Sequence, residues 1–274
     1  MALTLRVMPV SFFCGSYINQ AVFLELNHLS QSVAPSIWVL LSNAGDGFFA
    51  MALATVLFAA HPERMKLVVV SGIMALLIVH IMKYLFDVSR PPAVLAADVF
   101  HIIGPAYKRG SFPSGHAATA FLMAGIVWHC CRATPIRATV MLLAALSAFS
   151  RVAVGVHWPF DVLVGAGLGL LCVGASIRMC KLTGERRPSD RSNHLSAVLC
   201  ASLGGCFSVA LFFRKTGMET YFLGGLCQYL LALCGLFVCF GILRKKLALA
   251  WASWHFSFCL KGLKIRPFGK RTKL

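Results

Sequence analysis

Residues 150–161 read SRVAVGVHWPFD, and they join two apolar runs at 140–149 and 162–177. Each run, taken with its flanking residues, approaches the roughly 20 apolar residues that a helix needs to cross a bilayer. The quoted stretch is therefore predicted to lie where one membrane helix ends and the next begins. It holds Arg151, His157 and Asp161 within twelve residues, so three ionisable groups are expected close to one membrane surface.

The composition around this stretch is that of a membrane protein. Of 274 residues, 58% are hydrophobic and only 13% are charged, whereas the surface of a soluble domain of this length must carry more charge. We therefore expect an all-α, polytopic helix bundle. The N-terminal segment is interpreted as a retained first helix, because it lacks a small-residue cleavage site. Eight membrane spans are expected at about 8–24, 46–61, 66–87, 114–131, 137–155, 157–179, 194–213 and 221–243.

The charge distribution predicts the orientation. An even number of spans places both termini on one side, and most of the 26 lysines and arginines then fall on that side. The positive-inside rule favours a cytoplasmic location for both termini. The net charge of +17 is interpreted as a topology and lipid-headgroup signal, so no nucleic-acid partner is expected. The tail at 251–274 is predicted to lie on the cytoplasmic leaflet. The basic residues expected on the outer side are Lys83, Arg90, Lys108, Arg109, Arg151, Arg214 and Lys215.

Three polar clusters share that outer side: KYLFDVSRPP at 83–92, SFPSGH at 111–116, and the opening stretch. Lys83, Arg90 and Arg151 are cations near a membrane surface, and the sequence offers no matching set of carboxylates. An anionic ligand would supply the missing charge, and the arginine fork suits phosphate oxygens. Ser114 and Gly115 precede an expected helix, where free backbone N–H groups receive the same kind of anion.

Two histidines and an aspartate complete the predicted chemistry. His157 and Asp161 are four residues apart, so on a helix they lie on one face. A carboxylate in that position holds one imidazole nitrogen and leaves the other as a nucleophile. His116, at another helix start, suits the role of proton donor to a leaving oxygen. The pattern predicts phosphoryl transfer through a histidine.

Each residue also has a simpler interpretation on its own. His157 alone is more often a packed histidine, Lys83 alone a snorkelling lysine, and Arg90 before two prolines a loop charge. The joint pattern decides between them. Lys83, Arg90 and Pro91, then PSGH at 113–116, then Ser150, Arg151, His157 and Asp161 follow one another on one side of the membrane.

This joint pattern resembles the three signature motifs of the type 2 phosphatidic acid phosphatase (PAP2) superfamily of membrane lipid phosphatases, over roughly residues 40–180. The resemblance implies that His157 attacks phosphorus, Asp161 orients it and His116 protonates the leaving group. It implies a phosphate site of Lys83, Arg90, Ser114, Gly115 and Arg151, with no metal or other cofactor. It also implies a six-helix core, so residues 1–180 are expected to form the phosphatase core. Residues 181–274 are expected to add about two membrane helices.

The sequence leaves the substrate open. A site at headgroup depth favours a lipid phosphate or diphosphate. Undecaprenyl diphosphate, phosphatidylglycerophosphate, phosphatidic acid and a lipid A phosphate all fit, in what we expect to be a bacterial inner membrane. Lys108 and Arg109 either contribute specificity or are solvated loop charges. A lipid-to-lipid phosphotransferase is the close alternative, while an anion transporter and a silent scaffold are weaker ones. The oligomeric state stays open.

Overall fold

The computed structural model describes residues 16–58, 61–182, 190–215 and 222–262. All regular structure in these ranges is helical, which confirms the all-α prediction. Most helices lie close to the expected spans, and α11 continues well beyond its expected end. The elements are α2 (Tyr17–Ser30), α3 (Pro35–Ala44), α4 (Gly47–Phe58), α5 (Pro62–Phe86), α6 (Pro91–Val94), α7 (Gly115–Cys130), α8 (Thr134–Ala153), α9 (Pro159–Leu182), α10 (Asp190–Phe213) and α11 (Phe222–Gly262).

Several helices are long and apolar enough to cross a membrane. Among the described residues these are Glu63–Val94, Thr134–Ala153, Pro159–Cys180 and Gly224–Lys246, with α3 and α4 as a fifth span bent by 65°. Large apolar side chains such as Leu163 and Phe237 are 70% and 79% exposed on them. Such surfaces suit lipid contact and not water, so the chain is an integral membrane protein.

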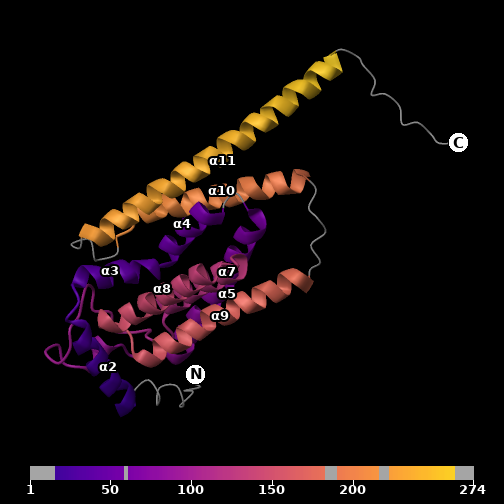
Figure 1. Cartoon of the computed structure of the whole chain (residues 1–274). Coiled ribbons are helices and arrows are strands. Elements are labelled where there is room, and N and C mark those ends of the chain that lie inside the picture. The colour runs from indigo at the N-terminus through magenta and orange to yellow at the C-terminus, as the bar shows by residue number, and fades with distance from the viewer. Residues whose placement is uncertain (1–15, 59–60, 183–189, 216–221, 263–274) are drawn as a thin grey trace, which may run out of the picture.

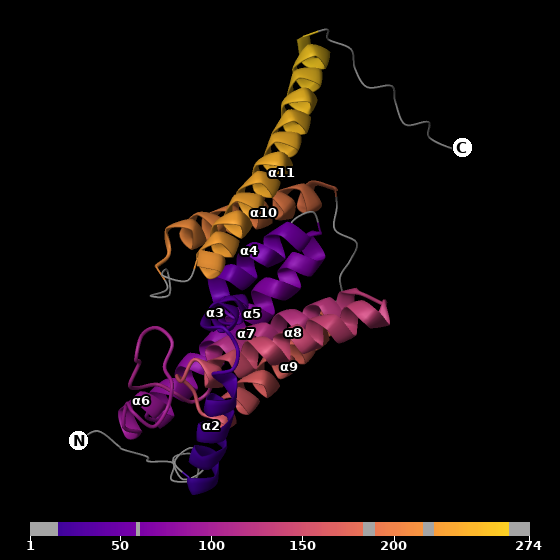
Figure 2. The same ribbon diagram turned by 60° about the vertical axis from the view of Figure 1, so that its left-hand side comes forward.

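The helices form two groups on either side of the bent pair α3–α4 (Figures 1 and 2). Helices α5, α7, α8 and α9 pack together on one side. Helices α10 and α11 pack against each other and against α4 on the other side, and α11 also contacts α3. The C-terminal helices therefore join the bundle chiefly through α3 and α4, with a smaller direct contact between α10 and α5.

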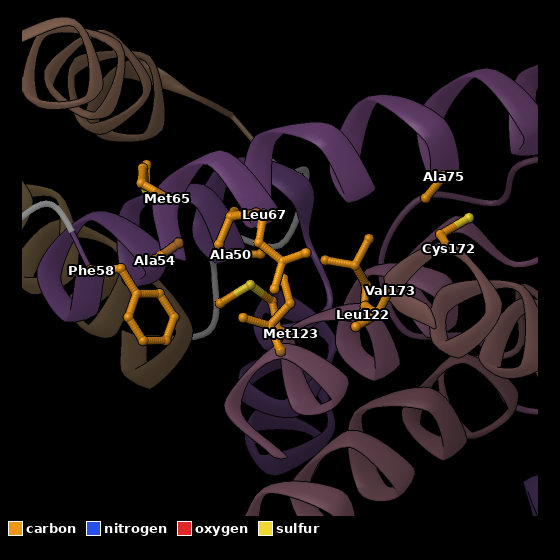
Figure 3. Close-up of a cluster of buried hydrophobic side chains, with 12 residues drawn as sticks. Ala50, Ala54, Phe58, Met65, Leu67, Ala75, Leu122, Met123, Cys172 and Val173 are labelled. Carbon is orange, nitrogen blue, oxygen red and sulfur yellow. The ribbon is translucent and has the colours of Figure 1, made fainter. Parts of the chain in front are cut away.

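The largest apolar cluster lies where α4, α5, α7 and α9 meet (Figure 3). Phe58, Met65, Leu122, Met123 and Val173 are each at most 8% exposed in it. Because lipid is as apolar as these side chains, close packing and not removal from water holds such helices together. This cluster fixes the far end of the bundle relative to the polar end described below.

Two glycines allow α9 to approach α7 closely. A Cβ atom at Gly169 would overlap the carbonyl oxygen of Ala118, and one at Gly165 would overlap that of Ser114. This four-residue spacing of small residues is a common contact between membrane helices. Gly167 faces away from α7, and a Cβ there would meet nothing within 4 Å. The contact brings the first turn of α7 beside the first turns of α9.

The first helix differs from the expected span at 8–24. Helix α2 begins at Tyr17 and is not among the candidate membrane spans of the described residues. It lies across the end of the bundle where α8 ends and α9 begins (Figure 2), held there by polar side chains such as Asn19 and Asn27. Apolar content alone predicted a span, whereas these buried amides seat the helix on the bundle end. Residues 1–15 lie outside what the structure describes. Of the tail at 251–274 that was predicted to lie on the leaflet, residues 251–262 continue helix α11 and residues 263–274 lie outside the described ranges.

The glycine contact predicts a selective loss of stability. Gly169→Leu should destabilise the protein by about 1–3 kcal/mol, because the new side chain has no room against the α7 backbone. Gly167→Leu is the matched control and should change little, since that position is open. Unfolding in mixed micelles measures both. Equal losses, or none at Gly169, would contradict this account of the α7–α9 contact.

Candidate active site

The predicted site residues gather at one end of the helix bundle. Lys83 lies in the last turn of α5, and Arg90 is the residue that precedes α6. Ser114 caps the start of α7, and Gly115 and His116 begin that helix. Arg151 lies in the last turn of α8, His157 in the turn that follows, and Asp161 in the first turn of α9. The ends of five helices, α5 to α9, therefore bring these side chains to one place.

His157 and Asp161 form a buried pair. The Nδ1 atom of His157 lies 3.4 Å from Oδ2 of Asp161, and the two side chains are 2% and 0% exposed. The turn between α8 and α9 sets this geometry, because the backbone N–H of His157 donates to the carbonyl of Arg151 at 3.2 Å. Gly155 makes the turn possible with a φ of +80°, where a Cβ would also overlap the carbonyl of His101.

Asp161 is held by more than the histidine. Its Oδ2 atom accepts hydrogen bonds from the hydroxyl of Ser111 and from the backbone N–H of Trp158, the latter at 3.0 Å. Ser111 belongs to the SFPSGH cluster, but the sequence alone predicted no role for it. Its partner Asp161 lies 50 residues away in the chain. These bonds fix the carboxylate, so that it orients the imidazole of His157.

Lys83 and Arg90 hold the loop that follows α6. The Lys83 ammonium donates to the carbonyl of Gly110. Arg90 donates from Nη2 to the same carbonyl at 3.2 Å, from Nε to that of Arg109 at 2.9 Å, and from Nη1 to that of Val156 at 3.2 Å. The last bond ends next to His157. Both cations thus face the nucleophile segment, with backbone carbonyls as partners and no carboxylate in an ion pair with either among the described residues.

The start of α7 lies directly against the start of α9. The backbone N–H of Ser114 donates to the carbonyl of Asp161 at 3.0 Å, and its hydroxyl accepts from the N–H of Ala117 at 3.4 Å. The glycine contact between α7 and α9 makes this approach possible. His116 therefore begins its helix beside the His157–Asp161 pair, and its role as a proton donor stays a prediction.

Burial and the nearby cations together lower the pKa of the His157 imidazole. Burial lowers the pKa of His157 well below its ordinary value, because the imidazolium loses its hydration, and the positive charges of Arg90, Arg151 and Lys83 lower it further. His157 is therefore neutral at pH 7. A neutral imidazole has the free electron pair that a nucleophile requires.

Two of the loop charges stay outside this cluster. Lys108 is exposed, and the Arg109 side chain is 83% exposed, with its guanidinium 3.6 Å from the carboxylate of Asp87. Only the Arg109 carbonyl reaches the site, as an acceptor for Arg90. In the described part of the chain, no group of three or more His, Cys, Asp or Glu side chains is arranged to hold a metal ion.

Helix α2 closes the site from the end of the bundle. The side-chain amide of Asn27 is fully buried and donates to the carbonyls of His101, Val152 and Ala153 at 2.9–3.2 Å. The ring of Phe23 packs edge-on against Trp158 with centroids 5.2 Å apart. The sequence did not predict this role, because Phe23 fell within the expected membrane span at 8–24 and Asn27 fell outside every expected element.

Comparisons with known proteins agree with this geometry. A family model described as the PAP2 superfamily matches residues 64–185, the segment that carries every predicted site residue. The undecaprenyl-diphosphatase of Sulfolobus acidocaldarius is 27% identical over 166 residues, which span 55% of this chain and 73% of that protein. Undecaprenyl-diphosphatase BcrC of Bacillus subtilis is 27% identical over 151 residues, spanning 53% and 76%.

Two further similarities differ in extent. YbjG of Escherichia coli is 40% identical over 70 residues, so the match spans only 34% of its length. The crystal structure of Aquifex aeolicus LpxE superposes with a TM-score of 0.51 at 29% identity. That superposition covers 98% of LpxE but 60% of this chain, and the family model ends before α10.

The lowered pKa of His157 predicts how stability depends on pH. In the unfolded chain this histidine binds a proton below about pH 6.5, whereas the folded site resists protonation, so stability falls as the pH drops below that value. His157→Gln should make the fall shallower. His28→Gln, at an exposed position on α2, is the control. Melting temperatures between about pH 5 and pH 8 measure the effect. Parallel curves for wild type and His157→Gln would contradict the assignment.

Proposed function

We propose that this chain, which belongs to the PAP2 superfamily through residues 64–185, hydrolyses a lipid phosphate or diphosphate through a phosphohistidine on His157. The observation that carries the proposal is the buried His157–Asp161 pair beside three cations at one end of a membrane bundle. Undecaprenyl diphosphate is the substrate we favour. Two relatives, matched over most of their own length, are named as undecaprenyl-diphosphatases.

The chemistry follows from the orientation of the imidazole. Because Nδ1 of His157 faces the Asp161 carboxylate, Nδ1 carries the proton and Nε2 keeps its electron pair. Nε2 attacks phosphorus in line with the leaving oxygen, so an N–P bond forms while the P–O bond breaks. The negative charge of the bound phosphate group favours the imidazolium form of His116, which then gives its proton to the leaving oxygen. Water then attacks the phosphohistidine, His116 takes a proton from it, and inorganic phosphate leaves.

The remaining residues bind the transferred group. Lys83, Arg90 and Arg151 neutralise the charge on its equatorial oxygens as the trigonal-bipyramidal transition state forms. The backbone N–H of Gly115 opens the 16-residue helix α7 and adds a fixed donor, while the N–H of Ser114 donates to the carbonyl of Asp161 and so positions this helix start. Lys83 and Arg90 now donate to the Gly110 carbonyl, and phosphate oxygens compete for the same donors. Phosphate binding is therefore coupled to the position of the loop before Ser111.

The same intermediate permits one alternative. If a second lipid replaces water in the second step, the protein is a lipid-to-lipid phosphotransferase. Nothing in the His157–Asp161 geometry separates the two acceptors. A transporter of anionic lipid or phosphate does not need a histidine held by a carboxylate, so the same pair argues against that function.

Activity measurements on lipid phosphates test the proposal. Wild type should release phosphate from undecaprenyl diphosphate with EDTA present, and His157→Ala should lower the rate by at least about 1,000-fold. Phosphatidylglycerophosphate, phosphatidic acid and a lipid A phosphate complete the substrate panel, and His28→Ala is the control. A newly phosphorylated lipid in place of free phosphate would identify the phosphotransferase. Full activity in His157→Ala, or no turnover of any substrate, would overturn the proposal.

We also propose that the site faces the outer side of a bacterial inner membrane and that the C-terminal segment is cytoplasmic. The opposite ends of the helices carry Arg64 and Lys66 at the start of α5, Arg132 between α7 and α8, and Arg137 at the start of α8. This is the distribution that the positive-inside rule describes. The expected cytoplasmic N-terminus rests on residues outside the described ranges. The division of the chain near residue 180 stays a proposal too.

A cysteine-accessibility experiment tests the orientation. In a variant without reactive native cysteines, Arg109→Cys should react with an impermeant maleimide added to intact cells, because position 109 is exposed at the site end. Arg132→Cys should react only after the membrane is opened. The reverse pattern would place the site on the cytoplasmic side.

A further inference from the structure

Arg151 is held in an unusual way for a buried cation. Its side chain is 4% exposed, and no carboxylate of the described residues forms an ion pair with it. Its guanidinium donates a hydrogen bond from Nη1 to the hydroxyl of Ser42, and its buried Nε atom has no partner among the described residues. A buried charge without a counterion is costly unless a ligand completes it.

Ser42 belongs to a part of the chain that the family match does not include. It lies in the last turn of α3, before the break where the chain bends by 65° into α4. Its side chain is 2% exposed. The hydroxyl restricts the long arginine side chain to one position, which reduces the entropy that phosphate binding would otherwise cost.

The break after Ser42 also touches the proposed proton donor. A Cβ atom at Gly45 would lie 2.9 Å from the carbonyl oxygen of His116 and 3.1 Å from its Cβ. Only glycine permits this approach without displacing the start of α7. Residues 42–45 therefore contact α7 and α8 at once, next to Arg151 and His116.

The added helices hold this break from the other side. The carboxylate of Asp46 lies 3.0 Å from Nη2 of Arg214, at the end of α10, and the Arg214 guanidinium lies over the ring of Phe48 at 4.4 Å. The side-chain amide of Asn43 donates to the carbonyl of Gly224 in α11 at 3.4 Å. These polar contacts of α10 and α11 therefore involve Asn43 and Asp46, which are next in sequence to Ser42 and Gly45.

We propose that Ser42 is a positioning residue for Arg151, and that helices α10 and α11 support it through the Asp46–Arg214 pair. The proposal rests on the proposed function, in which Arg151 binds the phosphoryl group. It gives the C-terminal addition a role in the site, although neither helix supplies a group that touches the reacting atoms.

Substitution of Ser42 tests the first part, with orthovanadate as a phosphate probe. Ser42→Ala should weaken orthovanadate binding, measured by thermal shift, by roughly tenfold, and should lower kcat/KM by a similar factor. Ser42→Thr keeps the hydroxyl and should stay within about threefold of wild type. The control is Ser71→Ala, which removes a fully buried hydroxyl that bonds only within α5.

The outcomes separate the two proposals. Unchanged orthovanadate binding in Ser42→Ala, or an equal loss in Ser71→Ala, would overturn the positioning role while leaving the phosphatase proposal intact. A loss in Ser42→Thr as large as in Ser42→Ala would overturn it too. If wild type binds orthovanadate but turns over no substrate, the proposed function fails and the Ser42 result still stands on binding.

A double-substitution cycle tests the support from α10. Arg214→Gln should weaken orthovanadate binding by about threefold in wild type and by much less in Ser42→Ala, because both changes act on the same element. Additive effects would show that Arg214 acts independently of Ser42, and would overturn the second part of the proposal.

Discussion

Lys83, Arg90 and Arg151 bring three positive charges to one end of a bundle whose surface is built for lipid, and Asp161 is the buried carboxylate among them. Cations in such a place are stable only when hydrogen bonds or a counterion satisfy them. Here the carbonyls of Gly110 and Val156, and the hydroxyl of Ser42, hold them in place without neutralising them. Such a surplus of positive charge suits an anionic ligand, and it adds to the effect of burial, which lowers the pKa of His157.

The rest of the structure serves to bring these groups together. The helices that carry them end at the same level because α9 packs tightly on α7 through Gly165 and Gly169. The tight turn at Gly155 then places His157 one turn before Asp161. The C-terminal helices contact α3, α4 and, to a smaller extent, α5, and in our proposal they support the site through the residues next to Ser42.

Much of this was predictable from the sequence, for physical reasons. Long apolar runs have one stable form in a bilayer, so the bounds of α5, α7, α8, α9 and α10 were predicted closely, whereas α11 runs on past its apolar part to Gly262. Site residues such as Lys83 and His157 stood out because charge in such a chain demands a partner. Ser111 and Ser42 did not stand out in this way. Serine is common in helical chains, and only the structure shows that these two bind Asp161 and Arg151. The sequence predicted a membrane span at 8–24, whereas α2 lies at the end of the bundle. Its polar residues bind the bundle, but in the sequence they look like interruptions of a weakly apolar span.

The central claim is that the phosphoryl group passes through a covalent bond to His157. Rapid denaturing quench of the protein with labelled substrate, followed by peptide mass spectrometry, tests it most directly. The account predicts an acid-labile, base-stable phosphoryl group on the peptide that contains His157, absent from His157→Gln. A label on another residue, or turnover with no labelled peptide under conditions that trap phosphohistidine, would contradict it.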